Sequence, residues 1–419
     1  MANRTVVVCY ILIVWFAISF VTNIIGPLMP VIIRDFGLSL TLAGFLPFSF
    51  FLAYGVVSIP AGMMVEAAGP KATLLAAFCL NLAGAMLFAL MPGYGVAVGA
   101  LFVIGIGMAM LQVVINPLMR TAGGDAHFAF FSVLGQLVFG LASFVSPLVF
   151  AALMARGEAG APLFGLPAAE PAWIALYWMF GLIFATLILV TIGMRVPRIE
   201  LKSEERTGSA LAYRQLLADP KVRLFFLGIA AYVGTEQSLA NWMSQFLATY
   251  HGVAPETDGA HAVAMFWGWM VIGCAAGLVL LKLIDSKLVL RIAAIAAIAC
   301  VAVALFGGRE ASLLAFPASG LCISVMFSII FSLALNSVSH NHGALSGILC
   351  TGILGGAIVP LIVGIVGEWF GLRIALLIVF VTLGFILSAS FWADPLTRNR
   401  TIRLRKPAAP DHHGQKEYQ

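Results

Sequence analysis

Twelve long apolar runs, separated by polar loops, dominate this sequence. A helix needs about 20 apolar residues to cross a bilayer, and each run reaches that length. With 62% hydrophobic and only 10% charged residues, the chain carries far less charge than a soluble domain, in which about 25% of residues are charged. We therefore predict an all-α integral membrane protein whose spans lie at about 6–30, 41–65, 72–91, 95–119, 128–154, 172–194, 222–250, 260–283, 287–307, 312–338, 343–367 and 371–393.

The basic residues are distributed unevenly between alternate loops. If the N-terminus is cytoplasmic, all but four of the 23 Lys and Arg residues fall in cytoplasmic loops and tails. The four exceptions are Arg34, Arg156, Arg309 and Arg373. Because an excess of basic residues marks the cytoplasmic side, we expect a multi-pass protein of the cell inner membrane with both termini in the cytoplasm. Because these basic residues serve to orient the protein in the membrane, the net charge of +5 does not indicate a nucleic-acid partner.

A hydrophilic stretch in the middle of the chain divides the spans into two sets of six. We expect an N-terminal six-helix bundle at 1–194, a cytoplasmic linker at 195–221, a C-terminal six-helix bundle at 222–393 and a disordered cytoplasmic tail at 394–419. Asn116 and Asn336 recur in the fourth span of each set, and Pro147 and Pro360 recur in the fifth. This common order suggests a parallel repeat. Transporters built this way bind their solute near the midplane between the two halves.

One acidic residue, Glu236, lies in the middle of the seventh run. A charged side chain at that depth costs on the order of 3 kcal/mol, so we expect it to face the bundle interior or a water-filled path. Gln237 and Asn241 follow it and are four residues apart, which places both on one face of a helix. We predict that Glu236 is an ion-coupling or gating group and that the two amides bind solute.

The other spans carry neutral polar groups. We predict that Asn23, Gln112, Asn116 and Gln136 also bind solute, and that Trp15, Trp242, Trp267 and Trp269 supply aromatic faces. Amides pair with hydroxyl groups and indole rings stack on sugar rings, so this set favours an uncharged, sugar-like solute. We find no mid-span Arg or Lys for an anionic solute, and only one acid for a cationic one. The sequence has no metal-ligand spacing, so we expect no cofactor or metal. Besides the solute, we expect the surrounding membrane lipid to be a partner.

A loop between the second and third spans holds a glycine, an acid, a second glycine and a base. These residues are Gly62, Glu66, Gly69 and Lys71. Their order resembles a degenerate form of the major facilitator signature loop. In that superfamily the charged residues of this loop help to hold the cytoplasmic side closed.

Longer motifs narrow the resemblance. The segments LQVVINP at 111–117, YVGTE at 232–236 and GGAIVP at 355–360 resemble the fucose–proton symporter family, the sugar-transporting branch of the major facilitators. The resemblance covers all twelve spans. It implies twelve helices in two six-helix pseudo-repeat bundles, and uptake of a hexose or deoxyhexose driven by an ion gradient.

The chain departs from that family at three positions. Asn23 stands where proton-coupled members have an aspartate, Gln112 where they have a glutamate, and Phe139 where they have an asparagine. An amide has no proton to release at physiological pH, so the usual coupling groups are absent. Three interpretations stay open. Coupling could have moved to Glu236, since burial favours the protonated form of a carboxylic acid; the protein could be an uncoupled facilitator; or Na⁺ could bind amide oxygens.

Other functions also stay open at this level. An exporter of an amphipathic small molecule, or a non-transporting sensor on the same fold, would fit the same spans. We do not expect an enzyme, because the loop acids are scattered and form no paired or metal-binding set.

Overall fold

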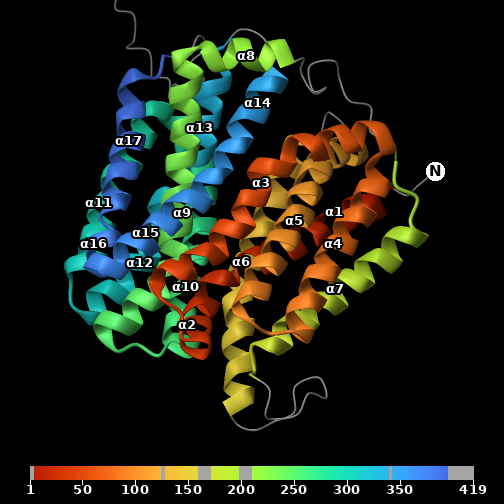
Figure 1. The fold of residues 1–419 in the computed structure, drawn as a ribbon. Coiled ribbons are helices and arrows are strands. Elements are labelled where there is room, and N and C mark those ends of the chain that lie inside the picture. The colour runs from red at the N-terminus through yellow and green to blue at the C-terminus, as the bar shows by residue number, and fades with distance from the viewer. Residues whose placement is uncertain (1–3, 124–127, 159–170, 198–209, 339–341, 395–419) are drawn as a thin grey trace, which may run out of the picture.

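The computed structural model describes residues 4–123, 128–158, 171–197, 210–338 and 342–394 (Figure 1). These residues form helices connected by short turns. The predicted tail therefore lies almost wholly outside the described residues, as does part of the predicted linker.

The first half of the chain contributes seven helical segments. They are α1 (Arg4–Thr22), α2 (Ile25–Phe36), α3 (Leu40–Ala68), α4 (Pro70–Leu90), α5 (Tyr94–Gly123), α6 (Phe128–Glu158) and α7 (Ile174–Gly193). Together α1 and α2 make the first predicted span, which is interrupted after Thr22. The interruption has a local cause: Pro27 lacks an N–H group, so the carbonyl of Asn23, four residues earlier, loses its helical partner.

The second half is more segmented. It contains α9 (Pro220–His251), a π-helical turn (Pro255–Gly259), α10 (Ala260–Leu283), α11 (Ser286–Phe306), α12 (Arg309–Ile323), α13 (Met326–Leu335), α14 (His342–Thr351), a 3₁₀ turn (Gly352–Leu354), α15 (Gly355–Phe370), α16 (Leu372–Ala375) and α17 (Ile378–Trp392). The short helix α8 (Ala210–Ala218) lies within the predicted linker. All twelve predicted spans coincide with helices, and the prediction of an all-α membrane fold is confirmed.

One span differs from the rest in composition. Eleven stretches of the described chain are long and apolar enough to cross a membrane, and α9 is not among them. This helix has 32 residues, but its polar side chains, Glu236 among them, dilute its apolar character. The least apolar span is therefore the one that carries the buried acid.

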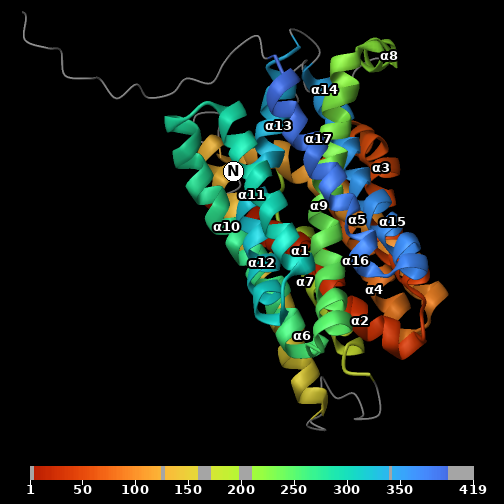
Figure 2. The same ribbon diagram turned by 90° about the vertical axis from the view of Figure 1, so that its left-hand side faces the viewer.

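The two halves lie side by side and meet most closely at one end. Figures 1 and 2 show α8 at the top of the molecule and α2 toward the bottom; we call these ends the linker side and the far side. On the far side α2 packs on α9, and a Cβ added to Gly26 would collide with the carbonyl oxygen of Ala240. Farther out, α15 packs tightly on the start of α3, because a Cβ added to Gly364 would lie only 2.6 Å from the carbonyl oxygen of Leu40.

Polar contacts close the same end. Arg34 at the end of α2 forms an ion pair with Glu256 in the π-helical turn. The backbone N–H of Thr41 donates to Glu368 of α15 at 3.3 Å. These contacts join the two halves across the far side, so the described conformation is closed there.

Candidate solute-binding site

Asn23 lies at the break between α1 and α2 and is 5% exposed. Its amide nitrogen donates to the carbonyl oxygen of Ser19 at 3.1 Å and to the hydroxyl of Ser143 on α6 at 2.9 Å. The hydroxyls of Ser19 and Ser143 are themselves 2.6 Å apart. Both amide hydrogens are therefore directed into the protein. The amide oxygen accepts no hydrogen bond from the residues that the structure describes, so Asn23 offers an acceptor.

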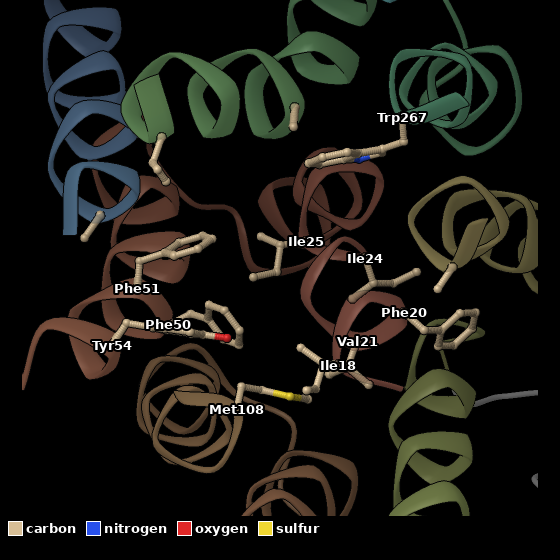
Figure 3. Packing of buried hydrophobic residues seen from close by; sticks show 14 of the residues in the cluster. Ile18, Phe20, Val21, Ile24, Ile25, Phe50, Phe51, Tyr54, Met108 and Trp267 are labelled. Carbon is tan, nitrogen blue, oxygen red and sulfur yellow. The ribbon is translucent and has the colours of Figure 1, made fainter. Parts of the chain in front are cut away.

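Aromatic and apolar side chains surround this break. Figure 3 shows Phe50, Phe51 and Tyr54 of α3 facing the stretch that contains Ile24 and Ile25. Tyr54 is 5% exposed and interacts with Thr22, the last residue of α1. Thr22 donates to the carbonyl oxygen of Ile18 at 2.8 Å. The N-terminal half thus presents a largely apolar wall around the polar groups at the helix break.

The predicted amides of α9 lie where the halves touch. Gln237 and Asn241 are 6% and 3% exposed, and the Asn241 amide nitrogen lies 3.5 Å from the Gln237 side-chain oxygen. A Cβ on Gly26 would lie 3.6 Å from the Cα of Asn241, and a Cβ on Gly356 would lie 3.1 Å from Cγ of Gln237. The two amides are therefore enclosed by α2 of one half and α15 of the other.

Glu236 differs from both of its neighbours along the chain. Thr235 and Gln237 are buried, whereas Glu236 keeps partial exposure. Its carboxyl group interacts with Tyr232, one helical turn earlier, and with Cys274 of α10. Thr235, on another face of the helix, is bound to Thr382 of α17 at 2.6 Å. The carboxyl group is thus directed away from α17, on a face shared with α10.

Trp267 of α10 also belongs to this site. The sequence indicated it only as one of several tryptophans. It is 3% exposed, and its indole N–H is buried without a partner among the described residues. Figure 3 shows its ring directed toward Ile24 and Ile25, and α10 packs on α2. A buried donor without an acceptor costs about 1–3 kcal/mol. The mid-helix position of this tryptophan was the only signal for it in the sequence.

The remaining predicted site residues are less closely associated with this region. Gln112 on α5 is half-buried and has a partner, and Gln136 on α6 is exposed. Asn116 lies within α5, but its side chain is outside the described residues. The structure therefore brings together Gln237 and Asn241 at the contact of the halves, with Asn23 three residues before Gly26 in the facing segment.

The predicted signature loop lies on the linker side, away from these amides. Gly62 lies in α3, and Gly69 joins α3 to α4 with a φ of +82°, a conformation that favours glycine. The side chain of Glu66 is outside the described residues. Lys71 donates from Nζ to the carbonyl oxygens of Ile192 and Met194 at 2.8 and 2.9 Å, and so binds the C-terminal end of α7.

Comparison with known proteins identifies the family. Residues 11–353 match the Major Facilitator Superfamily. The chain belongs to this superfamily. Members of the Major Facilitator Superfamily are membrane transporters, so the chain is not an enzyme, as predicted.

Two relatives of this facilitator carry names that bear on its solute. A glucose/galactose transporter of Brucella abortus biovar 1 (strain 9-941) is 32% identical over 381 residues, which cover 89% of this chain and 90% of the relative. The L-fucose-proton symporter of Escherichia coli (strain K12) is 22% identical over 386 residues, which cover 87% and 86%. The predicted resemblance to the fucose–proton symporter family is thereby confirmed.

Solved structures of other facilitators have the same fold. A bacterial homologue of the human lysosomal transporter Spinster, in an inward-facing and unoccupied conformation, matches with a TM-score of 0.76 at 16% identity over 92% of this chain and 97% of that one. A single-residue variant of the E. coli fucose:proton symporter matches with a TM-score of 0.66 at 20% identity over 94% and 99%. The twelve-helix architecture of this facilitator is thus shared with both.

Proposed function

We propose that the protein is a secondary active transporter that moves a neutral hexose across the cell inner membrane by alternating access. The observation that carries this proposal is that Gln237 and Asn241, two buried amides of α9, lie where the C-terminal half meets α2 of the N-terminal half at Gly26, three residues after Asn23. A solute bound there would touch both halves, as alternating access requires. The names of the relatives, which mention glucose, galactose and L-fucose, support a hexose as the solute.

Neutral donors and acceptors in this region suit sugar hydroxyls. The free oxygen of Asn23 would accept from one hydroxyl, and the unpartnered N–H of Trp267 would donate to another. Gln237 and Asn241 would bind further hydroxyls from the C-terminal half, with Gln112, Asn116 and Gln136 lining the approach. A site that hydrogen bonds each hydroxyl discriminates strongly against analogues that lack one, because its buried polar groups are then left unpaired.

For the orientation, we propose that the linker side and both termini face the cytoplasm. The excess of basic residues in the linker and the tail supports this orientation. The far side would then be the outer side, and the described conformation would be inward-facing, with the pair Arg34–Glu256 joining the outer ends of the halves. The boundaries 1–194, 195–221, 222–393 and 394–419 stay our proposal for the domains.

For the coupling ion, we favour the proton, with Glu236 as its carrier. Glu236 is partly accessible and interacts with Tyr232, and a carboxyl group in such a position can exchange a proton with water. A Na⁺ site would have to be built mainly from carbonyl and amide oxygens, because the described residues contain no cluster of three or more His, Cys, Asp or Glu.

Exchange of labelled sugar tests the transport proposal, because exchange needs no ion gradient. Proteoliposomes loaded with unlabelled D-galactose should take up labelled D-galactose, D-glucose or L-fucose faster than protein-free liposomes. Unlabelled hexose should compete, and a charged sugar such as glucuronate should not. Reconstituted, folded protein that exchanges none of the three hexoses would contradict the proposal.

The coupling proposal needs a second measurement on the same proteoliposomes. An inward proton gradient should drive accumulation, whereas replacing external Na⁺ by choline should leave accumulation unchanged. Accumulation that requires Na⁺ would favour amide-bound Na⁺ instead. Exchange without accumulation under either gradient would identify a facilitator.

A further inference from the structure

Two of the four basic residues predicted for the outer loops are gathered at one place on the far side. Arg373 in α16 lies against the ring of Tyr250, the residue before His251 at the end of α9. Ser312, three residues after Arg309 at the start of α12, lies 3.0 Å from Nε2 of His251. Both arginines thus lie close enough to act on His251. Basic residues are scarce on the far side, yet the fold brings these three together from spans seven, ten and twelve. We refer to Arg309, Arg373 and His251 as the far-side basic cluster.

Arg373 is held in place by its backbone and by two aromatic rings rather than by a carboxylate. Its backbone N–H donates to the hydroxyl of Tyr250 at 3.2 Å. Its guanidinium carbon lies 4.6 Å from the centroid of the Tyr250 ring and 5.9 Å from that of Phe246. The two rings and the backbone contact therefore fix the orientation of the guanidinium plane.

The hydrogen-bonding capacity of that guanidinium is unused. A guanidinium has five N–H donors, and Nε of Arg373 is buried with no partner among the described residues. Across the described ranges, the two ion pairs both involve Arg34, so no described carboxylate pairs with Arg373 or Arg309. A half-buried cation with free donors and no counter-charge is a site for an anion.

The C-terminal end of α9 does not account for these free donors. A helix C-terminus attracts cations, which helps to explain why basic residues gather there. However, the carbonyl oxygens of Leu247 and Ala248 already accept from the N–H groups of Val253 and Gly252. Gly252, with a φ of +60°, closes the helix in the left-handed conformation. Two of the carbonyls in the last turns of α9 are thus satisfied by the backbone rather than by the arginines.

Exposed aromatic residues next to the cluster indicate where the anion comes from. Trp369 and Phe370, at the end of α15, are 80% and 66% exposed, and they immediately precede Gly371 and α16. Exposed aromatic rings at the end of a membrane span lie at the level of the lipid headgroups. A planar guanidinium binds phosphate oxygens in a bidentate manner. We propose that the far-side basic cluster binds the phosphate of an anionic phospholipid in the far-side leaflet.

Thermal unfolding of the full-length protein in detergent tests this proposal. Phosphatidylglycerol should raise the unfolding midpoint more than phosphatidylcholine does, and Arg373→Gln should remove more than half of that difference. Arg156→Gln is the matched control, because Arg156 is an exposed far-side arginine outside the cluster. An equal effect of phosphatidylglycerol on wild type and Arg373→Gln would overturn the proposal. A rise given equally by inorganic phosphate would overturn the assignment to a lipid.

Native mass spectrometry keeps the proposal testable if Arg373→Gln does not fold. The wild type should retain phosphatidylglycerol in preference to phosphatidylcholine. Arg309→Gln and Arg373→Lys, which are milder changes, should each lower the retained phosphatidylglycerol. Retention unchanged in both variants would contradict the site. The cluster is separate from the proposed sugar site, so these results do not depend on the transported solute.

Discussion

In the N-terminal half the first span breaks at Asn23, whereas its counterpart in the C-terminal half, α9, continues unbroken for 32 residues. Pro27 causes the break, and α9 has no proline beyond its first residue. The two spans also carry different chemistry. The broken span offers a neutral amide whose hydrogens are already bound, and the unbroken span carries Glu236 and two further amides.

Elsewhere the halves repeat each other closely. Lys71, at the start of the third span, donates to the end carbonyls of the sixth span at 2.8 and 2.9 Å. Lys287, at the start of the ninth span, donates to the carbonyl oxygens of Phe391 and Ala393, at the end of the twelfth, at 3.4 and 2.6 Å. The comparison teaches that the frame is duplicated, whereas the polar groups in the first span of each half are not. Solute binding and coupling should therefore depend on unrepeated residues, and stability on repeated ones.

The largest expected effect comes from the acid that only the second half carries. Glu236→Gln should abolish proton-driven accumulation, because the amide cannot release a proton, while sugar exchange continues. Accumulation and exchange are measured in proteoliposomes with and without an imposed pH gradient. Glu310→Gln, which removes an exposed acid on the far side, is the control and should retain both activities. Gradient-driven accumulation by Glu236→Gln would exclude this role.

The next largest effect is expected from changing Asn23, the amide at the break between α1 and α2. In Asn23→Asp, only the protonated carboxyl group could donate to the carbonyl oxygen of Ser19, so sugar exchange should fall as pH rises. An unsatisfied buried group costs about 1–3 kcal/mol, which predicts a loss of roughly tenfold or more at high pH. Exchange by the wild type should change far less over the same pH range.

A matched variant separates the solute site from general destabilisation. Asn81 of α4 is also buried and donates to the carbonyl oxygen of Ala77, four residues earlier, at 2.9 Å. Asn81→Asp makes the same change away from the site. If exchange per folded molecule depends on pH equally in both variants, the special role of Asn23 is wrong.

A smaller effect should follow from filling the contact between the two dissimilar spans. Gly26→Ala places a methyl group against the carbonyl oxygen of Ala240, and overpacking of this kind costs about 1–3 kcal/mol. The variant should disfavour far-side closure, which accessibility of a far-side cysteine probe would report. Gly99→Ala is the control, because a Cβ there meets nothing within 4 Å. Equal accessibility in the two variants would contradict the assigned contact.

The smallest effects should be equal in the two halves. Lys71→Met and Lys287→Met each remove a cation from a helix C-terminus, which is worth about 0.3–1 kcal/mol. Each should lower the unfolding midpoint slightly and by a similar amount, with sugar exchange per folded molecule retained. A large loss of exchange in only one variant would show that this pair is not part of a duplicated frame.

The fold was predictable because apolar run length is a strong signal in a membrane protein. All twelve spans follow from it, even though α9 is the least apolar of them. The break at Asn23 follows from the position of Pro27, once the missing N–H group is considered. The helix α8 was not predicted, because its nine residues lie in a polar stretch without long apolar periodicity.

The candidate site was predictable only in part. Glu236, Gln237 and Asn241 stand out because polar groups within an apolar run are expensive. The partner of Asn23, Ser143, is 120 residues away in the chain, so no local pattern could reveal which end of the amide is free. The unpartnered N–H of Trp267 likewise depends on tertiary packing. The roles of all these residues in transport remain predictions.

The composition of α9 has a consequence for how the protein is made. A segment with an acid and several amides partitions poorly into lipid by itself, so the translocon alone would release α9 into the bilayer inefficiently. Of the helices that cover its polar face, α2 is synthesised earlier and is already in the membrane when α9 emerges from the ribosome, whereas α10 and α15 follow it in the chain. Insertion of the second half should therefore depend on prior assembly of the first.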